Sequence, residues 1–153
     1  MHVTRIEQIG REVMAGQLTG RILGAAMDVH REIGPGFLEV IYQRALKHEL
    51  ELIGMSAEAE VDYAVECKDL VVGRHRVALI VEQTVVLELK ASSAINQAHI
   101  AQTLSYLKAT RLELALILNF GTPSLQWKRL IRSHNPPNKS EHQPIPSPNS
   151  PSA

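Results

Sequence analysis

One short segment constrains the fold of this chain more than any other: the run Val-Val-Leu-Glu-Leu-Lys-Ala from Val85 to Ala91. Apolar and β-branched residues dominate this run, which is typical of a strand buried inside a sheet. Glu88 and Lys90 interrupt it two residues apart, so both side chains project from the same face of the strand. A buried charge is costly unless it is paired or binds a metal. The two charges therefore form either an ion pair near the end of a strand or part of a functional site.

Apolar periodicity predicts the elements around this strand. Spacings of three and four residues indicate helices, and alternation indicates half-buried strands. Short connections between the first strands favour antiparallel pairing, and a crossover helix permits parallel pairing afterward. We therefore expect an α/β fold with a mixed central β-sheet flanked by helices. The expected helices span residues 19–33, 37–53 and 96–109, and strands are expected at 61–67, at 77–81, around Glu88, at 112–120 and at 127–132.

The composition bounds the class of protein. The 153 residues are 44% hydrophobic, enough for one domain with a real core. Sixteen basic and sixteen acidic residues leave a net charge of zero, so contact with nucleic acid must rest on a local patch. The single Cys67 and the absence of a long apolar run favour a soluble cytoplasmic protein without a membrane partner. The sequence divides into an N-terminal arm (1–15), a domain (16–133) and a disordered Pro/Ser-rich tail (134–153).

A second motif, G-x-x-E-x-x-Y, runs from Gly36 through Glu39 to Tyr42. Together with Glu88-Leu89-Lys90-Ala91, it resembles the GxxExxY protein family, a branch of the PD-(D/E)XK nuclease superfamily. The resemblance covers about residues 16 to 132 and implies a restriction-endonuclease-like core. Further matching segments follow in order: Leu18-Thr19-Gly20, Gly24-Ala25-Ala26, Val29-His30, Gln102 with Tyr106-Leu107, and Leu118-Asn119-Phe120.

The resemblance implies a Mg²⁺ site, with Mn²⁺ as a substitute, that cuts phosphodiester bonds of nucleic acid. Glu88 would bind the metal, and Lys90 would place a positive charge beside the attacking water and the phosphate. The superfamily also uses an aspartate on the preceding strand, within a segment expected to read R-x-D-L-L-V. This chain has Ala78 at that position. A three-residue hairpin loop at residues 82–84 would place Ala78 opposite Glu88, and a two-residue loop would place Val77 there. The metal therefore lacks one expected ligand in either register.

Two further polar residues are candidates for this site. The resemblance implies that Glu39 reaches the metal beside Glu88, and we expect the helix that carries Glu39 to cover the face of the sheet that carries Glu88. The alternative is a solvated glutamate at a helix N-terminus, which the helix dipole favours. Gln102 and Tyr106 lie four residues apart on one helix face. The resemblance implies that Gln102 points over the sheet toward the site, whereas without it an ordinary amphipathic boundary is the simpler interpretation. Tyr42 and Tyr106 would support the site from these helices.

Three functions remain open from the sequence. The first is a Mg²⁺-dependent nuclease, impaired by Ala78, with Glu39, Glu88, Lys90 and Gln102 as catalytic residues and DNA favoured over RNA. The second is a catalytically inactive protein of nuclease fold that binds nucleic acid or a protein partner. The third is a structural subunit of a homodimer. The sequence does not distinguish endonuclease from exonuclease action.

Overall fold

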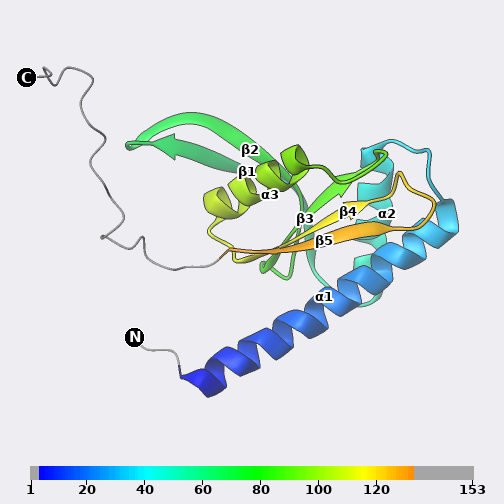
Figure 1. Cartoon of the computed structure of the whole chain (residues 1–153), viewed down its shortest axis with the longest axis horizontal. Helices are drawn as coiled ribbons and strands as arrows, with labels where there is room; N and C mark the ends of the chain where they lie inside the picture. The colour runs from blue at the N-terminus through cyan, green and yellow to red at the C-terminus, as the bar shows by residue number, and fades with distance from the viewer. Residues whose placement is uncertain (1–3, 133–153) are drawn as a thin grey trace, which may run out of the picture.

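A five-stranded mixed sheet carries helices on both of its faces in the computed structural model, which describes residues 4–132 (Figure 1). The strands lie in the order β1-β2-β3-β4-β5, and all neighbours are antiparallel except the parallel pair β3 and β4. The predicted mixed sheet with flanking helices is confirmed. The elements are α1 (Arg5–Ile33), α2 (Glu39–Leu52), β1 (Ala57–Cys67), β2 (Leu70–Val81), β3 (Val85–Lys90), α3 (Gln97–Thr110), β4 (Leu114–Asn119) and β5 (Gln126–Ile131).

Helix α1 is much longer than the helix expected from residue 19. It begins at a capping box, in which the Thr4 side chain accepts from the Glu7 N–H and the Glu7 carboxylate accepts from the Thr4 N–H. It ends at Gly34, whose φ of 68° suits glycine and whose N–H donates to the His30 carbonyl. Residues 5–15, which the sequence set apart as an arm, are therefore the first turns of this helix. The predicted tail at 134–153 lies outside the described residues.

The sheet separates two hydrophobic clusters. On one face, α1 and α2 pack through residues such as Ile22, Tyr42 and Leu46 against Leu87 and Leu116. On the other face, α3 packs through Tyr106 and Leu107 against Val86 and Ile117. Strand β4 is buried along its whole length, as expected of an interior strand covered on both faces. None of the helices within 4–132 has the length and hydropathy needed to span a bilayer.

Candidate functional site

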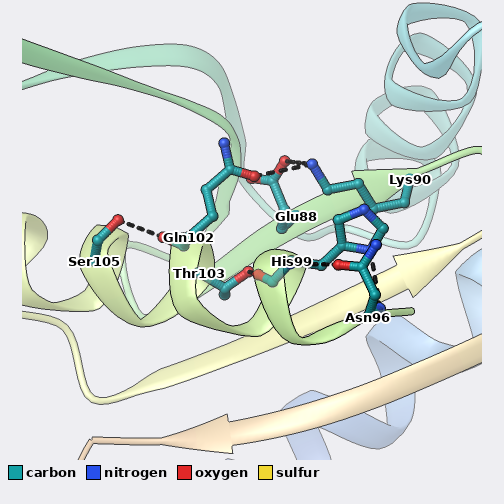
Figure 2. A network of polar contacts seen from close by, with 7 residues as sticks. All are labelled: Glu88, Lys90, Asn96, His99, Gln102, Thr103 and Ser105. Atoms are coloured by element: carbon teal, nitrogen blue, oxygen red, sulfur yellow. Dashed lines mark hydrogen bonds and ion pairs between the residues drawn. The ribbon is translucent and has the colours of Figure 1, made fainter.

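Strand β3 holds Glu88 and Lys90 side by side beneath helix α3 (Figure 2). Val86, two residues earlier on the strand, belongs to the cluster under α3, so Glu88 faces that helix as well. Lys90 Nζ lies 3.3 Å from Glu88 Oε1 and donates a hydrogen bond of 3.0 Å to Gln102 Oε1. The Lys90 and Glu88 side chains are only 12% and 8% exposed. The structure therefore brings three of the candidate residues into one polar network, which runs from the buried Glu88 to the exposed Gln102.

The Glu88 carboxylate is incompletely paired. Its Oε2 atom is buried and has no hydrogen-bond partner among residues 4–132. Burial raises the pKa of Glu88 above its ordinary value, the charge and hydrogen bond of Lys90 oppose that rise, and the charge of Glu39 adds to it. A buried acceptor without a partner destabilises a fold. Glu88 Oε2 is thus an atom at which a proton, a cation or a donor group would be stabilising.

The first turns of α3 hold Gln102 in place over β3. The Asn96 side chain accepts from the His99 N–H at 2.9 Å, and His99 Nδ1 accepts from the Asn96 N–H at 3.2 Å. One turn later, the buried Thr103 hydroxyl donates to the His99 carbonyl at 2.8 Å. Figure 2 shows this chain of contacts running along α3 beside Lys90 and Gln102. The cap fixes where the helix starts and therefore which side chain lies above the ion pair.

Glu39 does not lie on helix α3, which carries Gln102, but on helix α2. It is the first residue of α2, whose Tyr42 and Leu46 pack in the cluster on the opposite face of the sheet. The expectation that α2 covers the face carrying Glu88 is therefore wrong. The charge of Glu39 nevertheless contributes to raising the pKa values of Glu88 and Tyr106, so the start of α2 lies within electrostatic range of both groups.

A family model described as the PD-(D/E)XK nuclease superfamily matches residues 16–130. The chain belongs to the PD-(D/E)XK nuclease superfamily. No curated protein matches its sequence. Among solved structures, the crystal structure of SSO0001 aligns with a TM-score of 0.49 and 19% identity, covering 63% of this chain and 50% of that one. This chain thus spans half of that protein, and so distant a likeness does not bear on its function.

Ala78, which the sequence resemblance aligned with the superfamily's metal-binding aspartate, lies near the end of the β2–β3 pairing. The pairs Val81–Val85 and Leu79–Leu87 confirm a three-residue hairpin loop, but the pairing of β2 with β3 ends at Leu79 and Leu87, one residue before Ala78 and Glu88. The side-chain alternation slips here, however, because Val77 and Ile80 both belong to the cluster under α3 although they are three residues apart. The Ala78 side chain packs against the α1–α2 cluster instead. Ala78 therefore supplies no metal-binding oxygen, and its side chain packs on the face of the sheet opposite to Glu88.

The two tyrosines differ in what they support. The Tyr42 hydroxyl donates to the Gly34 carbonyl at 2.6 Å and accepts from the Phe37 N–H at 3.2 Å, and its ring stacks on Phe120. Tyr42 therefore fixes the turn before α2 and, through it, the position of Glu39. Tyr106 is buried on the α3 side, and burial, followed by the charges of Glu88 and Glu39, raises the pKa of its hydroxyl.

Sequence reasoning singled out the segment containing Asn119 but assigned the residue no role. Asn119 is fully buried at the end of β4, where its amide oxygen accepts from the Ser92 and Gly121 N–H groups. Its amide nitrogen donates to the Ser92 carbonyl and to Gln126 Oε1. These bonds tie together the chain leaving β3 and the chain leaving β4, directly beyond Lys90. An asparagine that ends a wholly apolar strand is the signal that could have identified it.

The donor atoms meet the lower limit for Mg²⁺, which proteins hold with one or two carboxylates while water completes the shell. Glu88 offers its unpartnered Oε2, and Glu39 lies within electrostatic range of it. Position 78 offers no ligand. Among the described residues, no three His, Cys, Asp or Glu side chains gather into a metal-binding group. The residues thus fit a weakly held divalent ion.

Proposed function

We propose that this chain is a weak Mg²⁺-dependent phosphodiesterase of the GxxExxY branch that acts on nucleic acid, on DNA in preference to RNA. The observation that supports this most is the polar network of Glu88, Lys90 and Gln102, in which one oxygen of the buried Glu88 carboxylate has no partner within residues 4–132. A buried carboxylate whose pKa is raised by desolvation costs stability. A functional use of the carboxylate accounts for its presence at the centre of a hydrophobic sheet.

Each residue of the network has a chemical role in this proposal. Glu88 Oε2 and Glu39 would hold Mg²⁺, which when bound supplies positive charge to the phosphate and acidifies a water. Lys90 neutralises negative charge that develops on the phosphate oxygens, and its burial strengthens that interaction. Gln102 holds the Lys90 ammonium through its amide oxygen, which leaves its amide nitrogen to donate to a phosphate oxygen. Lys90 is thereby oriented before substrate arrives.

The alternative function is binding of nucleic acid without cleavage. Ala78 favours it, because losing a carboxylate ligand weakens metal affinity and therefore metal-dependent hydrolysis. The two functions differ in their response to chelators. Cleavage requires the divalent ion, whereas binding through Lys90 and its neighbours would persist without it.

Cleavage of labelled DNA and RNA in Mg²⁺ or Mn²⁺ tests the proposal. We expect slow cleavage that is abolished by EDTA and by Glu88→Gln, and that is retained by Glu58→Gln, a matched change of an exposed glutamate on β1. Calorimetric titration of the ions should show weak binding that Ala78→Asp tightens. DNA binding that is unchanged in EDTA, with no cleavage in either ion, would establish the alternative and reject the proposed hydrolysis.

A further inference from the structure

Helix α1 carries a second apolar face, of which only Leu23 is partly buried against the domain. Its residues recur at alternating spacings of three and four, the pattern of a helix that pairs with another helix. The large side chains on it are exposed: Ile6 by 83%, Ile9 by 49%, Val13 by 54% and Met27 by 40%. We call this face the α1 seam, and its members are Ile6, Ile9, Val13, Gly16, Gly20, Leu23 and Met27.

The seam is separate from the face that α1 buries. Ile22, Ala26 and Val29 pack into the cluster beneath the sheet. At 3.6 residues per turn, the seam runs roughly 140° around the helix from that row. The seam itself contains no charged residue, because the charged residues between positions 6 and 27 lie on other faces: Glu7, Arg11, Glu12 and Arg21. A solvated helix face normally carries charge, so an uncharged face of this length indicates a partner.

The packing of the domain does not explain why glycines occur at the centre of this face. Gly16 and Gly20 lie in the seam and Gly24 lies beside it, all inside the helix. A Cβ added at any of the three would meet no atom within 4 Å. Each glycine costs about 1 kcal/mol of helix stability relative to alanine. Glycine is favoured where a second backbone packs closely against a helix. No segment within residues 4–132 packs against these three glycines, so a second chain is the remaining source of such a contact.

We propose that α1 pairs with α1 of a second copy of this chain, antiparallel, with the two helices crossing at Gly16 and Gly20. The order of the residues along the seam is self-complementary about this point. In the antiparallel register Gly16 faces Gly20 of the other copy, Val13 faces Leu23, and Ile9 faces Met27. Large side chains meet at both ends and glycines meet at the crossing. A two-fold axis requires such an arrangement, because each copy presents the same surface.

The size of the seam indicates how tightly the copies bind. Residues 6–27 span about 33 Å of helix, and a strip one helix diameter wide, about 10 Å, gives roughly 330 Å² of flat area per copy. Two such strips fall below the approximately 1,200 Å² of total buried surface at which stable interfaces begin. So small a buried area predicts a reversible dimer, whose formation depends on protein concentration. This inference does not rest on the proposed nuclease activity.

Sedimentation velocity of the full chain over a hundredfold range of concentration tests the dimer. The wild type should shift from its monomer mass of 16.9 kDa toward twice that value as concentration rises. Gly20→Leu inserts a branched side chain at the crossing, where the monomer has open space, and should weaken the dimer at least tenfold without loss of thermal stability. Gly10→Leu is the matched control, because Gly10 also has open space but lies about a quarter turn off the seam.

Cross-linking tests the orientation. With Cys67 changed to serine, copies carrying Ile9→Cys are mixed with copies carrying Met27→Cys. The antiparallel pair predicts disulfides between positions 9 and 27, whereas a parallel pair gives links between like positions. The proposal is overturned if the chain stays monomeric at every concentration, or if Gly10→Leu disrupts the dimer as strongly as Gly20→Leu. It is also overturned if the protein is monomeric and a seam substitution abolishes binding to lipid vesicles, which would make a lipid surface the partner.

Discussion

Replacing Lys90 by methionine isolates the energetics of the buried ion pair. The substitution keeps most of the side-chain volume but removes the ammonium that lies 3.3 Å from Glu88 Oε1. The Glu88 carboxylate would then be buried with both oxygens unpaired, since Oε2 has no partner within residues 4–132 to begin with. Removing one member of a buried pair is strongly destabilising, because it leaves an uncompensated charge.

The structure allows the size of this effect to be estimated. Breaking a buried pair costs about 3 to 5 kcal/mol. Lys90 is 12% exposed and Glu88 can take up a proton, so we expect the lower end, about 3 kcal/mol at pH 7. In a domain of this size, each kcal/mol of lost stability lowers the thermal midpoint by about 2 to 4 °C. A loss of about 3 kcal/mol therefore lowers the midpoint by about 6 to 12 °C.

The pH dependence follows from the sign of the pKa shift. Lys90 lowers the pKa of Glu88 against the effect of burial, so Lys90→Met raises this pKa further. Between the ordinary carboxyl pKa and the raised value, the folded state binds more protons than the unfolded state, and stability falls as pH rises. The cost of Lys90→Met should therefore be largest at neutral pH and shrink as the pH falls toward the ordinary carboxyl range.

Urea unfolding at pH 7 and pH 5 measures both effects. The matched control is Lys47→Met, which removes a surface pair with Glu51 whose side chains are 36% and 48% exposed, and which should cost less than about 0.5 kcal/mol. Adding Glu88→Gln to Lys90→Met should restore most of the lost stability. The reasoning fails if Lys90→Met costs no more than Lys47→Met, if its cost grows at pH 5, or if the double variant is no more stable than the single one.

Three further predictions concern stability. Glu88→Gln alone should gain stability relative to the wild type as the pH rises from the ordinary carboxyl range through the raised pKa; unfolding free energies that run parallel across pH would contradict that shift. Gly121→Ala should cost about 3 kcal/mol in urea unfolding, because the new Cβ would meet the Ser92 backbone nitrogen at 2.5 Å; a neutral effect would refute that close approach. Tyr42→Phe should cost about 1 to 2 kcal/mol by removing the bond to Gly34, and an unchanged midpoint would exclude this anchoring role.

The local features of the site were readable from the sequence. The alternation around Glu88 and Lys90 places both side chains on one face of β3, and Lys90 does lie beside Glu88. The sequence left a two-residue and a three-residue loop open after Val81, and the structure shows the three-residue loop that sets the register of the hairpin. The start of α1 was not predicted, although Thr4 and Glu7 form a capping box of the T-x-x-E type there.

The sequence by itself determined the order and type of the elements and which neighbours on β3 share a face, because those periodicities are set by local backbone geometry; it missed the first turns of α1 and the first residues of β1 and β2. Only the tertiary structure decided that α2 packs on the face opposite Glu88, and that the side-chain alternation slips at Ala78. Both outcomes depend on how the helices fill the space on the two sides of the sheet. That packing is settled by contacts between residues far apart in the chain, which no local pattern records.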